Sequence, residues 1–305
     1  MFSISQVPTS GEGGNMGMAK SDTVGKWSLD KLQCLKEYLE AYSSIMHTQR
    51  SWLKGHYYID AFAGSVTPWD RDSQEYIDGS PLVALKIEPQ FDGYYFIEKN
   101  SARIRDKIKP LKNQFPSKAI HIHHGDCNDV LLKEIIPQFS MLPSVMGFVF
   151  LDPYGIQVCF ETIKDIAGAK IFDIFVNFSV MGIYRQLRGK PPVGNEAKKI
   201  SQVMCCEDWV SAAYAKNLQL TLLDGYEPSP IKLNNIASNL AELYRRQLNT
   251  CFPHVSKAII MRNSKNGPIY ALILASHKEL AVKKMHEIFR RGEKRKRRGQ
   301  RLDTP

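Results

Sequence analysis

The chain has 305 residues, of which 43% are hydrophobic, and it carries a formal net charge of +10 at pH 7. This length and apolar content suffice for one large α/β core with an insertion, or for two modest domains. No apolar stretch reaches the ~18 residues of a membrane span, and the N-terminus lacks the basic-then-apolar pattern of a secretion signal, so we expect a cytoplasmic protein without a membrane association.

The N-terminal segment 1–25 is rich in Gly, Ser and Met, which predicts disorder. Apolar residues then recur at helical spacing between Leu29 and Ile45, which predicts an amphipathic helix over 26–50 with Ser28 as its N-cap. We expect this helix to open a domain over 26–289 and to pack over the ligand-binding edge of a central sheet.

Four apolar runs of strand length follow, and a carboxylate stands at the end of each run. The four residues are Asp60, Glu98, Asp126 and Asp152. A single carboxylate after a strand usually caps the next helix. Four of them, separated by helix-length segments, favour one ligand that lies across the carboxyl edge of a parallel sheet.

The segment after the first run consists of small residues and includes Phe62 and Gly64. Such a loop lets the backbone approach a ligand closely, as nucleotide-binding folds do at this turn. Further on, Ser80 precedes a proline and fits the N-cap of a helix that could receive a carboxylate, although a plain helix start fits the same residues. Glu98 lies 38 residues after Asp60, whereas a compact dinucleotide fingerprint has ~20, which counts against NAD.

The fourth run, GFVFLDPYG at 147–155, reads as a strand that is buried on both faces and stopped by Asp152-Pro153-Tyr154. An acid, a proline and an aromatic residue at a strand end can hold a flat ring that bears an amine. Asp152 would accept one N–H, the Pro153 carbonyl would accept another, and Tyr154 would stack on the ring. The plain alternative is a turn, since Asp-Pro commonly begins one after a strand.

The second half of the chain extends the same sheet. Residues 171–179 predict a fifth strand, 179–255 a helical insertion that is a possible substrate-recognition region, and 256–276 two strands joined at Asn266-Gly267. Five parallel strands followed by a hairpin predict an α/β protein with a Rossmann-like methyltransferase fold. We therefore expect a mostly parallel central sheet, helices on both faces and a terminal β-hairpin.

Basic residues cluster in two places. In the insertion, the candidates for nucleic-acid contact are Arg185, Arg188 and Lys190. At the end of the chain, residues 290–305 predict a disordered basic tail, in which the candidates are Lys294, Arg295, Lys296, Arg297 and Arg298. Such a cluster binds phosphate backbones without reading sequence, and a solubilising role is the alternative.

The six cysteines show no CxxC spacing and no matching histidine pairs. We therefore expect reduced thiols, with neither a disulfide framework nor a metal site. No Pro-Cys pair occurs, which disfavours the cysteine-dependent methylation of cytosine carbon.

Six strings stand in a recognisable order, namely WSLDKLQCLKEYLEAYSSIM, YYIDAFAGS, GSPLVAL, FIEKN, GDCNDVL and FLDPYG. Together they resemble the three-Cys-motif partner protein family, which is methyltransferase-like, over roughly residues 26–290. The family takes its name from a separate protein with a three-cysteine motif, which is a possible partner. The Asp-Pro-Tyr-Gly string is also similar to the Asp-Pro-Phe-Gly of tRNA guanine dimethyltransferases, which methylate an exocyclic amine.

The resemblance implies that the carboxylates bind S-adenosylmethionine. Asp60, Glu98 and Asp126 would take its ammonium, ribose diol and adenine in strand order, and Phe62 or Cys127 would cover the adenine or sulfonium face. The implied activity is methylation of an exocyclic amine of a nucleobase in nucleic acid.

One position departs from the family pattern, because Val66 stands where a second glycine is usual. Either the loop is shifted by a residue, or cofactor binding is weakened or lost. A non-catalytic methyltransferase-fold subunit therefore stays open as an alternative, and a NAD-binding Rossmann enzyme is a third hypothesis.

Overall fold

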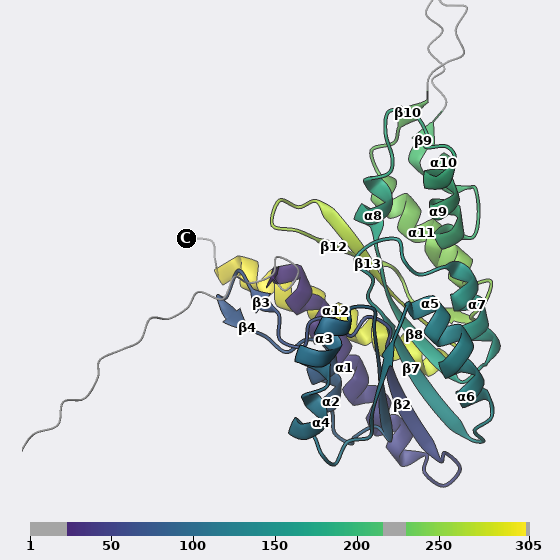
Figure 1. The fold of residues 1–305 in the computed structure, drawn as a ribbon. Helices are drawn as coiled ribbons and strands as arrows, with labels where there is room; N and C mark the ends of the chain where they lie inside the picture. Colours follow the sequence, from purple (N-terminus) through teal and green to yellow (C-terminus); the bar gives the residue numbers. More distant parts are fainter. Residues whose placement is uncertain (1–22, 216–229, 303–305) are drawn as a thin grey trace, which may run out of the picture.

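The computed structural model describes residues 23–215 and 230–302, with side chains as far as residue 295. Its centre is an eight-stranded sheet in the order β11-β13-β8-β7-β2-β5-β6, with β12 paired to β13 (Figure 1). The strands are β2 (Gly55–Asp60), β5 (Gly93–Glu98), β6 (Ile120–His124), β7 (Val145–Leu151), β8 (Phe172–Phe178), β11 (His254–Val255), β12 (Ile259–Arg262) and β13 (Pro268–Ser276).

Five neighbouring strands, from β6 to β8, are parallel, and β13 is antiparallel to β8. The reversal comes from the predicted hairpin, in which Asn266 adopts a φ of 59° between β12 and β13. A parallel sheet that ends in an antiparallel hairpin next to its fifth strand is the Rossmann-like methyltransferase fold. The predicted fold class is confirmed.

Side chains alternate between the two faces of the sheet, so each face has its own apolar core. Tyr58, Phe148 and Leu272 point to one core, whereas Ile59, Val149 and Ile273 point to the other. The first core is covered by α1 (Lys26–Thr48), α2 (Ser80–Leu85), the π-helix η2 (Ile104–Ile108), α4 (Leu111–Gln114) and α12 (Glu279–Leu302). The short helix α3 (Ser101–Arg103), which leads into η2, buries none of its residues. The second core is covered by α5 (Cys127–Val130), the π-helix η3 (Leu131–Ile135), α6 (Ile136–Ser140), α7 (Phe160–Gly168) and the helices of the insertion.

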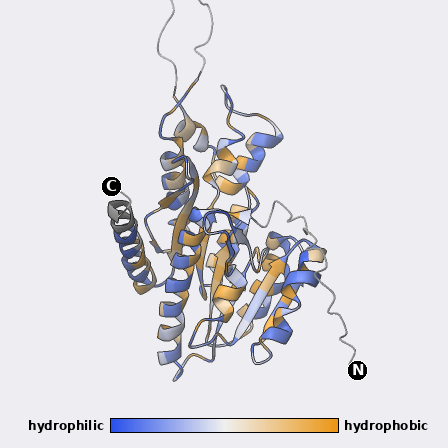
Figure 2. Ribbon diagram, turned by 90° about the vertical axis from the view of Figure 1, so that its left-hand side faces the viewer, coloured by the Kyte–Doolittle hydropathy of each residue, from blue (hydrophilic) through white to orange (hydrophobic). Residues whose placement is uncertain are grey.

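Figure 2 shows the consequence for the strands, which are mostly hydrophobic, while the helices carry hydrophilic residues on part of their surface. β7 is buried at each of its seven positions. The near-continuous apolar run of β7 thus follows from helices on both sides of the strand.

Helix α1 differs in two ways from its prediction. It begins at Lys26 with Gly25 as N-cap, so Ser28 lies inside the first turn and is buried. It also lies along one face of the sheet, where Leu35 and Leu39 are fully buried, and only its first two turns reach the ligand-binding edge. The apolar stripe of the helix extends over most of its length, which requires a face of the sheet rather than an edge.

The insertion at 179–255 is largely helical, as predicted, and rises beyond the sheet (Figure 1). Its elements are α8 (Val180–Tyr184), α9 (Asn195–Met204), α10 (Trp209–Ala213), β9 (Tyr214–Ala215), β10 (Ile231–Lys232) and α11 (Ile236–Leu248), and residues 216–229 lie outside the described part. Tyr244 of α11 stacks on Phe178 with ring centroids 4.1 Å apart. This contact joins the insertion to the end of β8.

Both ends of the chain differ from the predicted disorder where they are described. Residues 1–22 and 303–305 lie outside the described part, but Thr23–Val24 forms strand β1 beside β3 (Trp69–Asp70), which pairs with β4 (Glu75–Tyr76). Residues 290–302 continue α12 as helix. Arg291 and Arg295 of α12 approach Glu37 of α1 at 3.2 and 2.7 Å. These ion pairs and the buried residues just before them stabilise the end of α12 as a helix, although its charge predicted disorder.

The pairing of α12 with Glu37 leads to a prediction about local order. Glu37→Gln removes the charge that faces Arg291 and Arg295, so the last turns of α12 should exchange amide hydrogens faster. The global free energy of unfolding should fall by at most about 1 kcal/mol, because these pairs are partly exposed. Hydrogen exchange followed by mass spectrometry measures both, with Glu40→Gln on the same helix as the control. Equal exchange in the two variants would show that Glu37 does not hold the helix end.

Candidate active site

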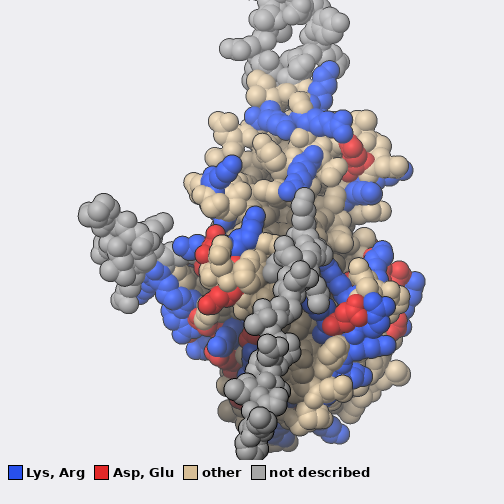
Figure 3. Space-filling view, turned by 60° about the vertical axis from the view of Figure 1, so that its left-hand side comes forward, with Lys and Arg blue, Asp and Glu red and all other residues tan. Residues whose placement is uncertain are grey.

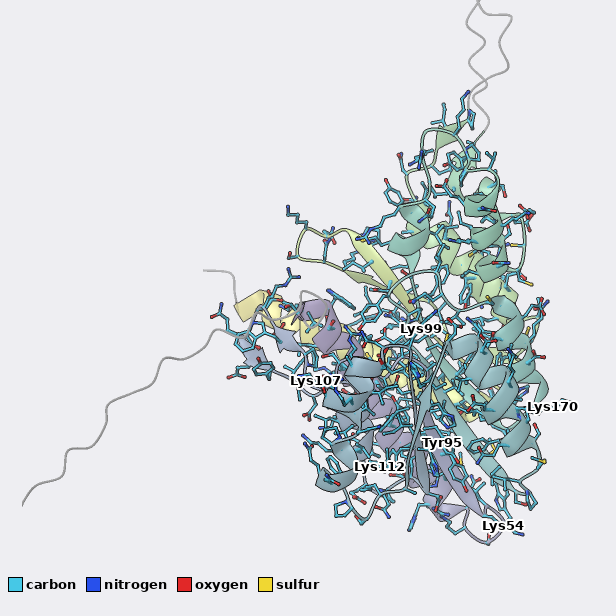
Figure 4. All side chains as sticks on the ribbon, viewed as in Figure 1. Lys54, Tyr95, Lys99, Lys107, Lys112 and Lys170 are labelled. Carbon is cyan, nitrogen blue, oxygen red and sulfur yellow. The ribbon has the colours of Figure 1, made fainter. Side chains whose placement is uncertain are left out.

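The four carboxylates predicted from the sequence meet at the carboxyl edge of the sheet. Asp60 and Glu98 are the last residues of β2 and β5, Asp126 follows β6 by two residues, and Asp152 directly follows β7. The four strands are parallel neighbours in the order β6-β5-β2-β7, so their ends stand side by side. Figure 4 marks this edge with Lys99 and the opposite edge with Lys54.

Asp60 lies beneath the loop that follows β2. It is fully buried, and its carboxylate accepts hydrogen bonds from the Phe62 amide and the Tyr58 hydroxyl, both at 3.1 Å. Burial raises the pKa of Asp60 to about 6, and nearby Asp152 adds to the rise, although the hydrogen bonds from Ser80, Phe62 and Tyr58 oppose it. Asp60 therefore fixes the loop backbone from below.

The loop itself is shaped by two glycines. Gly64 has a φ of +27°, and a Cβ atom there would lie 3.1 Å from the Tyr154 hydroxyl. A Cβ atom on Gly79 would lie 2.1 Å from the Ser65 carbonyl oxygen, so the loop nests against the start of α2 only if residue 79 is glycine. Val66 packs into the apolar core on the α1 side of the sheet, instead of bringing methyl groups toward a ligand.

Ser80 is not the predicted N-cap. Gly79 takes that position, and Ser80 is the first residue of α2, 8% exposed, followed by Pro81. Ser80 also forms a hydrogen bond to Asp60. The serine thus belongs to the hydrogen-bond network under the loop, together with Asp60.

Asp152 has a protein donor on each oxygen. The Lys31 ammonium lies 2.5 Å from Oδ2, and the Asn177 amide donates to Oδ1 at 2.6 Å. The Lys31 side chain is only 8% exposed, and its ammonium lies 5.2 Å from the centroid of the Trp27 ring. Sequence reasoning missed Lys31, although a lysine on the buried stripe of an amphipathic helix, four residues before Leu35, is a signal that a buried acid lies nearby.

Tyr154 is 57% exposed, and it contacts Arg103, which sequence reasoning missed as it missed Lys31. Arg103 of α3 donates to the Tyr154 hydroxyl at 3.1 Å, and its guanidinium lies 5.7 Å from the ring centroid. Arg103 also lies 3.9 Å from Glu98. The arginine and the tyrosine therefore form a bridge over the Gly64 loop, and we call this pair the Arg103–Tyr154 bridge.

Glu98 and Asp126 form the other half of the edge. Glu98 accepts a hydrogen bond from the Asn100 amide at 2.7 Å, and Asp126 caps α5 by accepting one from the Asn128 amide at 3.1 Å. Although burial acts to raise it, hydrogen bonds from Asn128 and Lys99 hold the pKa of Asp126 below its ordinary value. Burial also raises the pKa of Cys127 to about 12, so this thiol is protonated and packs into the core.

A cavity of about 80 Å³ lies between the first turns of α1 and the strand ends. It brings together predicted site residues from three segments of the sequence, namely Phe62, Ser80 and 152–154. The other residues that line it are Val24, Trp27, Ser28, Lys31, Leu32, Ser65, Pro68, Gly79 and Tyr270. Glu98 and Asp126 lie outside this lining. The hydroxyl of Ser28 is buried and has no hydrogen-bond partner among the described residues.

The predicted nucleic-acid contacts fall in two separate places. Arg185, Arg188 and Lys190 are exposed on the insertion, where Figure 3 shows Lys and Arg side chains gathered on the upper part of the face. Lys294 and Arg295 lie on α12, whose end points away from the insertion (Figure 1). The side chains of Lys296, Arg297 and Arg298 lie outside the described part.

The described residues contain no group of three or more His, Cys, Asp or Glu side chains that could hold a metal ion. None of the six cysteines, all of which lie in the described ranges, forms a disulfide. Among the helices in the described ranges, none combines the length and apolar character needed to cross a membrane.

Comparison with known proteins gives distant structural similarity only. No family model and no curated protein matches the chain. One similar solved structure is "Putative methyltransferase yhhF from Escherichia coli", at 12% identity and a TM-score of 0.33, covering 77% of this chain and 87% of that one. Another is protein LPL1258 of Legionella pneumophila, from the DUF519 family, at 12% identity and a TM-score of 0.37, covering 81% and 98%. The assignment to a methyltransferase-like fold therefore rests on the strand order described above.

The partly buried ion pair of Lys31 and Asp152 predicts a large effect on stability. Lys31→Ala leaves the Asp152 carboxylate without its cation, and breaking a buried pair in this way costs about 3–5 kcal/mol, with the lower end expected here because Asp152 is 20% exposed. Lys36→Ala on the exposed side of the same helix is the control and should cost under about 1 kcal/mol. Urea unfolding measures both. Equal losses in the two variants would mean that the ion pair contributes little.

The raised pKa of Asp60 predicts a dependence of stability on pH. Between about pH 4 and 6 the folded state holds a proton on Asp60 that the unfolded state has released, so the free energy of unfolding falls as the pH rises, by at most about 1.4 kcal/mol per pH unit. Asp60→Asn removes this contribution. The stability difference between variant and wild type should therefore change across this window and stay constant above it, whereas parallel curves would exclude a raised pKa.

Proposed function

We propose that this protein is an S-adenosylmethionine-dependent methyltransferase that acts on an exocyclic amine of a nucleobase in nucleic acid. The observation that carries the proposal is the position of Asp152, beside the Gly64 loop and in a cavity with Pro153 and Tyr154. A carboxylate at this point of a methyltransferase-like fold is placed to accept N–H groups next to the first strand-to-helix loop. The similarity to the three-Cys-motif partner family supports the same reading.

The residues at the strand ends fit S-adenosylmethionine, which supplies an activated methyl group on a sulfonium when it is bound. Glu98 would hold the ribose diol and Asp126 the adenine amine. Gly64 and its neighbours would receive the methionine portion, since only glycine lets the backbone come this close to Tyr154. The Arg103–Tyr154 bridge lies between Glu98 and the cavity. The hydrogen bond between Arg103 and Tyr154 would therefore have to break for S-adenosylmethionine to contact both.

The contacts of Asp152 suggest how an amine would be oriented. Lys31 occupies a position in which an N–H donor bonds to Oδ2, while Asn177 holds Oδ1 and fixes the carboxylate plane. Each carboxylate oxygen can accept a second hydrogen bond, so a substrate amine could donate to Oδ2 while the Lys31 ammonium stays in place and keeps the charge of Asp152 paired. Exocyclic amines are poor nucleophiles because their lone pair is delocalised into the ring, and an acceptor on one N–H favours the pyramidal, reactive form.

Binding of nucleic acid would use the basic residues. Arg185, Arg188 and Lys190 are exposed on the insertion beyond the ligand-binding edge, and the cluster from Lys294 to Arg298 lies on α12. Arginine and lysine at such positions add affinity for phosphates and lose it in salt. Tyr154 would stack on the base, which must leave a duplex or come from a single strand.

A second candidate function is a non-catalytic methyltransferase-fold subunit that works with a three-Cys-motif protein. The observation that favours it is the number of internal contacts at the site, because Lys31 and Asn177 satisfy Asp152 and the Arg103–Tyr154 bridge lies over the Gly64 loop. A NAD-binding enzyme has less support, since the sheet ends in an antiparallel hairpin.

Methyl transfer itself tests the proposal. The double variant Lys31→Met, Asp152→Ala removes the amine acceptor without leaving a buried ammonium unpaired, and Glu98 and the Gly64 loop stay in place. Transfer of labelled methyl to tRNA, rRNA or DNA should therefore fall about 100-fold or more while cofactor affinity changes little. Asp129→Ala, an exposed acid on α5, is the control and should transfer normally. Transfer that survives in the double variant would refute the amine-orienting role. No transfer to any of these substrates, with or without a partner protein, would favour the non-catalytic candidate.

A further inference from the structure

A second cavity lies at the opposite edge of the sheet. Its volume is about 260 Å³, and it is enclosed by the second half of α1, the start of α12 and the first residues of β7 and β8. Apolar side chains form most of its wall, among them Ile45, Met46 and Met146. Because an apolar cavity of about 150 Å³ can hold a benzene molecule, this space is large enough for two fused rings.

Two buried polar groups also line this cavity. Asp173 is 3% exposed, and its oxygens accept hydrogen bonds from Tyr38 at 3.1 Å and from Ser276 at 2.5 Å. Each carboxylate oxygen can accept a second hydrogen bond. Tyr42 is also buried, and its hydroxyl has no hydrogen-bond partner among the described residues. A ligand that donates an N–H group to Asp173 would therefore meet a polar wall that is not fully hydrogen-bonded.

The mouth of the cavity is open and mainly apolar. Trp52 and Leu280 line it while remaining 51% and 49% exposed, and large apolar side chains at a rim favour an apolar ligand. Lys278 and Lys284 also line the cavity, whereas its buried acid is Asp173. Lys284 is paired with Glu287 at 3.1 Å, so Lys278 and Asp173 are left as charges of opposite sign in the wall, and a neutral molecule fits best.

We propose that this cavity binds a neutral bicyclic aromatic molecule that carries an N–H donor, with the donor directed to Asp173 and the rings between Met46 and Met146. Indole is the simplest member of this class. The site is independent of methyl transfer, because it lies at the amino edge of the parallel strands, whereas the candidate active site lies at their carboxyl edge.

Two probes of nearly equal size test the role of the donor. Indole and 1-methylindole are titrated into the full chain labelled with ¹³C at the methionine methyl groups, and the signals of Met46 and Met146 are followed. Indole should shift both signals and bind about tenfold more tightly than 1-methylindole, as expected for one hydrogen bond to a charged acceptor. Equal affinities, or no shift of either signal with indole, would overturn the proposal.

Variants that fill the cavity test its location. Ala281→Phe and Ala41→Phe place a ring into the space from different helices and should each abolish indole binding. Ala119→Phe, at an exposed position before β6, is the control and should bind indole as the wild type does. The remaining methionine signals report whether each variant is folded. Indole binding that persists in either folded cavity variant would contradict the site.

Discussion

The ion pair between Lys31 and Asp152 is the interaction on which the architecture of the ligand-binding edge depends. With Asn177 it joins the first turns of α1, the end of β7 and the neighbouring strand β8. The pair lies mostly out of water, where the attraction between opposite charges is screened much less than at the surface. Trp27, on the same turn of α1, contacts Tyr270 with ring centroids 5.1 Å apart, and both residues line the cavity of the candidate site. The same helix then provides the surface that α12 covers.

This interaction also gives the site its chemical character. An acid that already holds an ammonium group still has a free acceptor position on each oxygen, so a substrate amine could bind to Asp152 while no buried charge is left unpaired. Over the Gly64 loop, the Arg103–Tyr154 bridge occupies space that the proposed cofactor needs. Binding of the proposed cofactor would therefore require the replacement of this internal contact by contacts to the ligand. The inferred methyl transfer and the non-catalytic alternative differ in whether that replacement occurs.

Much of the fold could be predicted from the sequence, because the strands are continuous apolar runs and their ends carry acids that the parallel order brings together. The predictions failed where the outcome depends on contacts between distant segments. Lys31 and Asp152 are 121 positions apart, and the partner of Arg103 lies in another loop, so no local pattern connects them. The end of α12 was predicted to be disordered from its charge, but Glu37 neutralises part of that charge. Gly79 rather than Ser80 caps α2 because the Ser65 carbonyl leaves no room for a Cβ atom at position 79.

Calorimetric titration of the full chain with S-adenosylmethionine, with NAD as the comparison ligand, measures whether the carboxyl edge of the sheet binds the proposed cofactor. We expect saturable binding of S-adenosylmethionine at one site per chain, and Glu98→Ala should lose most of that affinity while its unfolding without ligand stays nearly unchanged. NAD should give no saturable heat. An absence of S-adenosylmethionine binding to the wild type, or a preference for NAD, would contradict the proposed methyltransferase function.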